Sequence, residues 1–139
     1  MKKLNFDSGV KEYKINGGGV LRFNPADPNV YARFLEAADK IRAVETQMAS
    51  QADMQENTGA AALRLMQETD KQIKQILDWV FGGNNDFEQI LGGVNLLAMG
   101  SNGERIVTNL FAALQPVLVE GAQAFAKEKA AQIKAGSGR

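Results

Sequence analysis

Apolar residues recur with helical spacing in three long stretches of the chain. In the first stretch, residues 28–50, apolar side chains follow one another at intervals of four and three positions from Val30 to Met48. A second stretch, residues 60–81, and a third, residues 102–131, keep the same rhythm. Side chains at this spacing share one face of a helix, because 3.6 residues make one turn. We therefore predict three major helices, each with one apolar face.

The start of the chain follows a different pattern, in which apolar and polar positions alternate in short runs. Two such runs flank the dipeptide Asn16-Gly17, which is followed by two further glycines. Asn-Gly readily adopts the positive φ angles of a tight hairpin turn. We predict a β-hairpin near residues 11–24, to which Leu4 and Phe6 could add a third strand. An isolated hairpin is marginally stable in water, so this one is expected to pack on the helices.

Capping residues mark the start of two predicted helices. Asp27 can cap a helix whose first residue is Pro28. Proline is tolerated there because the main-chain N–H that it lacks would have no partner within the helix at that position. Asp86 can cap a short helix that runs through Leu91, between two pairs of glycines. Glycine readily ends a helix in the left-handed conformation. These signals separate the short helix from the long ones on either side.

The third long helix carries two further signals. Ser101 and Glu104 have the spacing of a capping box, which predicts a helix start close to residue 102. Pro116 lies inside the apolar pattern and is expected to kink the helix, because it removes one main-chain hydrogen bond.

The whole chain, residues 1–139, is expected to form a single domain. It comprises a hairpin region at 1–24, a helical region at 25–131 and a frayed tail at 132–139. The predicted fold class is α+β, mostly helical, with a small N-terminal β-hairpin packed on a helical bundle. The centres of the helical stripes are expected to form the shared core: Phe34, Ile41, Ile73, Leu77, Val107, Leu110, Phe111 and Leu114.

The residue composition argues against most enzyme classes. The 139 residues include no cysteine and no histidine, which removes the common thiolate and imidazole nucleophiles, bases and metal ligands. Sixteen basic and sixteen acidic residues balance, so no overall field attracts nucleic acid or a membrane. We predict no catalytic, cofactor-binding or metal-binding residue and no enzymatic activity. No stretch is long and apolar enough to span a membrane, and a cytoplasmic location is expected.

The carboxylates are the remaining candidates for acid–base or metal chemistry. Glu68 and Asp70 are two positions apart, as are Asp86 and Glu88, and such spacing places the members of each pair on different sides of a helix. Asp53 and Glu56 share a face but have polar surroundings, which provide no apolar wall to raise a pKa. None of these pairs predicts a site.

Two kinds of side chain leave alternatives open. Trp79 either closes the core beneath the following glycines, which we favour, or anchors a partner, since tryptophan is enriched at binding hot spots. The methionines either fill the core, the favoured interpretation for each singly, or adapt to varied partner contacts. The methionines concerned are Met48, Met54, Met66 and Met99.

Two segments of the chain resemble those of a known class of proteins. Residues 19–34 read GVLRFNPADPNVYARF, and residues 78–87 read DWVFGGNNDF, continuing to GSNGER at 100–105. Together they resemble small proteins encoded in tail modules of phages and prophages of Gram-positive bacteria. Those proteins are usually taken as tail assembly chaperones, which keep the long helical tape measure protein soluble while the tail tube polymerises.

The resemblance implies a function without catalysis. The expected partner is the tape measure protein or another tail protein, in the host cell cytoplasm, with self-association as a further expectation. Neither nucleic acid nor a membrane is an expected partner. Two alternatives stay open: a structural virion component, such as a tail-tube or completion protein, or another small helical protein-binding adaptor. The protein-binding residues are left undetermined by the sequence.

Overall fold

The computed structural model describes residues 1–54 and 59–137 and shows a mostly helical protein with one β-hairpin. The elements in chain order are β1 (Lys11–Lys14), β2 (Val20–Phe23), α1 (Pro28–Met54), α2 (Gly59–Phe81), α3 (Phe87–Ile90) and α4 (Ile106–Ser137). This arrangement confirms the predicted α+β class with its N-terminal hairpin.

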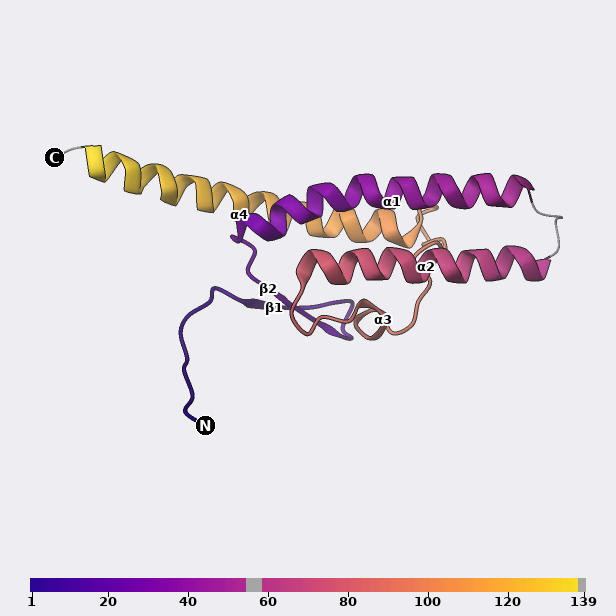
Figure 1. Cartoon of the computed structure of the whole chain (residues 1–139), viewed down its shortest axis with the longest axis horizontal. Helices are drawn as coiled ribbons and strands as arrows, with labels where there is room; N and C mark the ends of the chain where they lie inside the picture. The colour runs from indigo at the N-terminus through magenta and orange to yellow at the C-terminus, as the bar shows by residue number, and fades with distance from the viewer. Residues whose placement is uncertain (55–58, 138–139) are drawn as a thin grey trace.

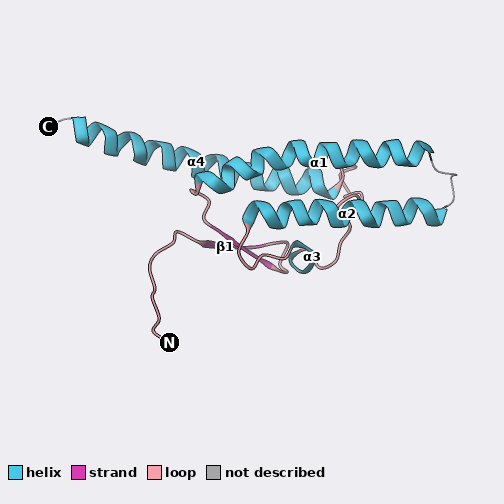
Figure 2. Cartoon of the chain, in the orientation of Figure 1, coloured by secondary structure: helices cyan, strands magenta, loops and turns pink. Residues whose placement is uncertain are grey.

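The three long helices form the body of the molecule (Figure 1). Helices α1 and α2 run antiparallel side by side, and α4 also packs against α1, with its first half seen between α1 and α2 in this view. The hairpin and α3 lie beneath α2, and the second half of α4 extends beyond the start of α1. Figure 2 shows that helix accounts for almost all of this body and that the strands occupy one corner.

The core lies where the apolar faces of the long helices meet the hairpin. Leu77 and Ile73 of α2 are fully buried, as are Leu118 of α4 and Leu21 of β2. Every predicted core residue is buried except Phe111, which is half-buried and stacks on Phe34 with 5.0 Å between ring centroids. The helical spacing of apolar residues therefore located the core correctly, apart from this one ring.

The hairpin has the predicted turn. Asn16 and Gly17 have φ angles of 50° and 73°, and the amide of Ile15 donates to the carbonyl of Gly19 at 2.8 Å. Strands β1 and β2 pair antiparallel, with Tyr13 opposite Leu21. Phe23 then packs edge-on against Phe81 at the end of α2, with the ring centroids 4.7 Å apart. This contact helps to supply the support that an isolated hairpin lacks.

The third strand that Leu4 and Phe6 could have formed is absent from the described chain. Residues 1–10 adopt neither helix nor strand, and they leave the body at the open end of the hairpin (Figure 1). Leu4 and Phe6 do alternate with polar residues, but this segment does not pair with β1. The chain instead bends at Gly9, which has a φ of 73°.

The helix starts marked by aspartate are confirmed. Asp27 accepts a hydrogen bond from the amide of Asn29 at 2.9 Å, and α1 begins at Pro28 as predicted. Asp86 caps α3 by accepting from the amide of Glu88 at 3.0 Å. Helix α1 runs to Met54, beyond the predicted end near residue 50, because its polar last turns contain no residue that stops a helix.

The predicted start of the last helix is wrong. Helix α4 begins at Ile106, and Ser101 and Glu104 do not form a capping box. The amide of Gly100 donates to the carbonyl of Glu104 at 2.7 Å, which closes a turn across these residues. The side chain of Asn102 accepts a hydrogen bond from the main-chain amide of Glu104 at 3.1 Å. The local sequence therefore forms a tight loop in the place of a first helical turn.

The far end of α4 also differs from expectation. The helix continues through Pro116 to Ser137 and so includes residues 132–137, where the sequence predicts a frayed tail. Residues 138–139 lie outside the described chain. Residues 126–131, which lead into this segment, consist of alanine, lysine and glutamate, and these strong helix formers favour continuation of the helix.

Candidate protein-binding surface

An open groove runs between α1 and α4. Its volume is about 400 Å³, and its walls are mainly apolar. The apolar lining comes from Ala38 and Ile41 of α1 and from Val107, Phe111 and Ala112 of α4. A concave apolar surface between two helices is a common site for docking an amphipathic helix.

The sequence places an alanine on each wall of this groove. Ala38 and Ala112 are too small to fill the space between the helices, so a channel remains. The Phe111 ring forms part of the wall, and its stacking on Phe34 anchors it to the core. The half-burial of Phe111 therefore reflects its position at the boundary between core and groove.

Leu35 continues the apolar surface along α1. It lies three positions before Ala38, which places both side chains on the same side of the helix, one turn apart. The residue is 53% exposed. An exposed leucine beside an open apolar groove enlarges the surface that a partner could cover.

Charged side chains border the groove. Arg42 and Glu45 of α1 belong to its lining, and Glu45 also pairs with Arg105 at 3.6 Å. Arg42 pairs with Asp39 at 3.1 Å. Exposed pairs of this kind contribute little to stability. Charges of both signs at the rim can, however, orient a partner that carries complementary charges.

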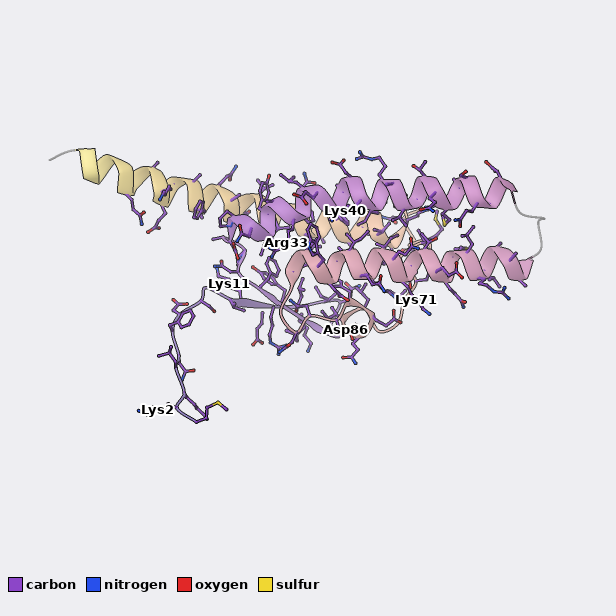
Figure 3. The ribbon with its side chains drawn as sticks, in the orientation of Figure 1. Lys2, Lys11, Arg33, Lys40, Lys71 and Asp86 are labelled. Atoms are coloured by element: carbon purple, nitrogen blue, oxygen red, sulfur yellow. The ribbon has the colours of Figure 1, made fainter. Side chains whose placement is uncertain are left out.

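Trp79 does not close the core, so the favoured prediction for this residue is wrong. Its side chain is 40% exposed, and the ammonium of Lys40 lies 3.7 Å from the ring centroid (Lys40 is labelled in Figure 3). The neighbouring residues Val80 and Phe81 are buried instead. Successive helical residues point in different directions, so these two turn inward while Trp79 turns outward, where a cation–π contact covers one face.

The methionines also divide between the two interpretations. Met48 and Met66 are partly buried and pack against the core, as favoured. Met99 is exposed, which contradicts the core interpretation for that residue. The side chain of Met54 lies outside the described residues. Met48, Met66 and Met99 are not among the described residues that line the groove.

An ion cluster around the buried side chains of Lys74 and Asp70 lies at the junction of α2, α3 and the segment before α4. The Lys74 ammonium donates to the carboxylate of Asp70 at 2.9 Å and to that of Glu88 at 2.5 Å. The lysine side chain is only 4% exposed. The Asp70 carboxylate also accepts a hydrogen bond from the main-chain amide of Leu96 at 2.8 Å. Lys74 therefore joins α2 to α3, and Asp70 joins α2 to the segment before α4.

Two opposing effects act on the pKa of Lys74. Burial favours the neutral amine and lowers the pKa, whereas the hydrogen bonds and negative charges of Glu88 and Asp70 favour the ammonium. The carboxylates prevail, and the pKa lies above its ordinary value of 10.5. Lys74 is thus charged at neutral pH and serves as a structural cation.

This cluster contains one carboxylate from each of the two pairs considered in the sequence, Glu68/Asp70 and Asp86/Glu88. Asp70, which is buried, and Glu88, which is exposed, both pair with Lys74, whereas Glu68 and Asp86 are exposed and do not. One signal for it exists in the sequence, since Asp70 and Lys74 have the four-residue spacing of a helical ion pair beside the apolar Ile73. Of the third pair, Asp53 is exposed and Glu56 lies outside the described residues.

Asp78 is a partly buried carboxylate near the end of α2. It accepts the amide of Phe87 at 2.8 Å, which connects the end of α2 to the start of α3. Burial raises the pKa of Asp78 above its ordinary value, the negative charge of Asp86 adds to this increase, and the Phe87 hydrogen bond opposes it. The geometry assigns this carboxylate a structural contact with the main chain.

The described residues contain no group of three or more acidic side chains that could hold a metal ion. Within the same part of the chain, no helix is long and apolar enough to cross a membrane. Comparison with known proteins identifies no relative: no protein-family model, no curated protein and no solved structure matches the chain.

Proposed function

We propose that the chain is a non-enzymatic tail assembly chaperone, which binds the tape measure protein through the groove between α1 and α4. The observation that supports this proposal is the open apolar groove, with its charged border and the exposed Leu35 beside it. Binding takes place in the host cell cytoplasm while the tail tube polymerises. The resemblance of residues 19–34, 78–87 and 100–105 to such chaperones supplies the identity of the client.

The shape of the groove favours a helical client. An amphipathic helix presents apolar side chains every three or four residues, and these can enter a channel between two parallel walls. Burying them removes apolar surface from water, which stabilises the complex by roughly 25 cal/mol for each Å² covered. A long helical protein would otherwise expose such stripes before assembly and aggregate.

The first prediction tests the groove directly. Ala112→Glu places a carboxylate on its wall, at an exposed position where the domain itself tolerates the change. We expect this variant to bind the tape measure protein at least about tenfold more weakly, because a charge facing an apolar partner surface loses hydration. The readouts are the soluble yield of the co-expressed tape measure protein and the affinity measured with a purified helical segment of it.

The matched control is Ala32→Glu, the same substitution at an exposed position of α1 that does not line the groove. It should leave both readouts unchanged, and circular dichroism should show that both variants keep their helices. Equal binding by the two variants would contradict the location of the site. A tape measure protein that is equally insoluble with and without the chain would contradict the chaperone function, and stable incorporation into purified tails would favour a virion component.

A further inference from the structure

The first ten residues form an arm with exposed apolar side chains. Leu4 and Phe6 are 89% and 79% exposed, and Figure 3 shows the arm standing clear of the body, with Lys2 near its end. Apolar residues at alternate positions lie on one side of an extended strand. The arm therefore has the pattern of a strand with one apolar face, but in the structure Leu4 and Phe6 on that face are exposed.

The outer edge of β1 offers a place for a strand. Within an antiparallel pair, opposite residues alternate between those that bond each other and those whose main-chain groups point outward. Ile15 bonds across to Gly19, so Lys14 and Glu12 on β1 and Arg22 on β2 point outward. On the β2 side, the Asn85 side chain accepts a hydrogen bond from the main-chain amide of Arg22 at 3.0 Å and donates one to the Arg22 carbonyl at 2.7 Å.

The β1 side lacks an equivalent cover. Among the described residues, no hydrogen-bond partner occurs for the main-chain groups of Glu12 and Lys14. Unpaired edges of this kind readily accept a strand from another chain. The hairpin therefore has one edge closed by Asn85 and one edge open.

An apolar groove lies beside the open edge. Its volume is about 310 Å³, and it is lined by Tyr13 and Ile15 on the β1 side and by Leu110, Leu114 and Val117 of α4. A strand added to β1 would extend the face that carries Tyr13 and Ile15. Apolar side chains on that strand would then cover this groove.

The arm is directed away from the β1 edge of its own chain. The Asn24 amide donates to the carbonyl of Ser8 at 3.1 Å, and the Asp7 carboxylate accepts the amide of Gly9 at 2.9 Å. These bonds fix the arm at the open end of the hairpin, where it runs outward (Figure 1). Pairing with its own β1 would require a reversal at these residues, whereas pairing with a second molecule would not.

We propose that residues 4–6 of one copy add as a strand to β1 of a second copy, with Leu4 and Phe6 covering the groove beside Tyr13. Each copy supplies one arm and one open edge, so reciprocal exchange closes a two-fold symmetric dimer. The residues of α4 that line this groove differ from those that line the groove against α1. The dimer therefore leaves the proposed client site open, and the inference goes beyond the proposed function.

The second prediction concerns the mass of the protein alone in solution, so it does not depend on client binding. Light scattering of the full chain should give twice the 15.1 kDa monomer mass. Phe6→Asp should return the mass to that of the monomer, because a charge replaces an apolar contact on an arm that makes no contact with the core. Asn5→Asp is the matched control, with the same added charge on the opposite side of the strand, and should stay dimeric.

The edge is tested by Lys14→Pro, which removes an outward main-chain donor and no bond within the hairpin. This variant should also be monomeric, with circular dichroism and melting checking its fold. A mixture of the Phe6→Asp and Lys14→Pro variants should form mixed dimers, because the first keeps its edge and the second its arm. A monomeric wild-type chain, or an oligomer that survives Phe6→Asp, would overturn the proposal, as would equal loss of the dimer in Asn5→Asp.

Discussion

Single polar side chains join segments that are far apart along this chain. The Arg33 guanidinium of α1 donates to the carbonyl of Val80 at 2.9 Å, close to the end of α2. Carbonyls at a helix end lack partners within the helix, and a cation there also favours the helix dipole. The Asn85 side chain bonds to the main-chain amide and carbonyl of Arg22, as a neighbouring strand would. Each of these side chains thus provides a hydrogen-bond partner for main-chain groups at the end of a helix or the edge of a strand.

The third prediction concerns Asp78. Because burial raises its pKa above 3.8, the folded protein binds this proton more tightly than the unfolded chain, and stability falls as pH rises from 3.8 through the raised pKa. The ionised carboxylate is therefore unfavourable at neutral pH. Asp78→Asn keeps an acceptor for the Phe87 amide and should match or exceed the wild-type stability at pH 7, with the difference shrinking below about pH 4.

Asp78→Ala provides the contrast, because it leaves the Phe87 amide without its acceptor. This variant should lose about 1–2 kcal/mol of unfolding free energy. Urea unfolding of the three proteins at pH 7 and at pH 4 measures both effects. Asparagine as destabilising as alanine would show that the charge itself, and not the acceptor oxygen, stabilises the junction of α2 and α3.

At the scale of elements, α4 is held against the connection between β2 and α1 by a very close approach. Gly121 is buried, and a β-carbon built at this position would lie 1.7 Å from the carbonyl oxygen of Pro25. No other residue type fits there without a shift of the backbone. The helix therefore contains a glycine despite the loss of helix propensity, roughly 1 kcal/mol relative to alanine.

The fourth prediction follows from this contact. Gly121→Ala should reduce the unfolding free energy by about 1–3 kcal/mol, because overpacking outweighs the better helix propensity of alanine. Gly59→Ala at the start of α2 is the control, since a β-carbon there has open space around it. Its stability should be unchanged or slightly raised in the same denaturant melt. Equal effects at the two sites would mean that α4 does not pack this closely on Pro25.

At the scale of the whole molecule, the Lys74 cluster adds polar contacts between segments that also share the apolar core. Asp70 and Lys74 belong to α2, Glu88 to α3, and Leu96 to the segment that leads into α4. Buried charges are costly unless every partner is present, because water no longer solvates them. The correct relative placement of all three segments is therefore favoured over alternatives that would leave a charge unpaired.

The fifth prediction tests this connection. Lys74→Met keeps the length of the side chain but leaves the buried Asp70 without its cation, and it should cost about 3–5 kcal/mol in unfolding free energy. Lys71→Met changes an exposed lysine of the same helix and should have little effect. Urea melts at neutral pH compare the two variants. A small loss in Lys74→Met would show that the cluster is dispensable.

The pH dependence of the wild type provides an independent check. The raised pKa of Lys74 means that its stabilising contribution is fully present below the pKa of an unfolded lysine, about 10.4, and is lost as pH climbs through the raised value. The wild type should therefore lose stability more steeply above that pH than Lys74→Met does. Parallel curves for the two proteins would contradict the raised pKa.

Local signals in the sequence were sufficient for most of the elements. The Asn16-Gly17 turn, the Asp27 and Asp86 caps and the apolar stripes each act through residues within about four positions, so neighbouring residues alone identify them. The same reasoning located the buried centre of each helix. It failed near Ser101, where hydrogen bonds within the loop from Gly100 to Glu104 replace the predicted capping box.

The surfaces and the polar interior were decided by tertiary structure. The outward direction of Trp79 depends on which side of α2 meets its neighbours, and the groove depends on Ala38 and Ala112, about 70 residues apart in the chain, lining the same space between α1 and α4. Glu88 reaches Lys74 only after the chain reverses between α2 and α3. The sequence by itself determined the helices, the hairpin and their apolar faces, because these depend on short-range spacing. Only folding in three dimensions determined which side chains meet across those faces and which stay open to a partner.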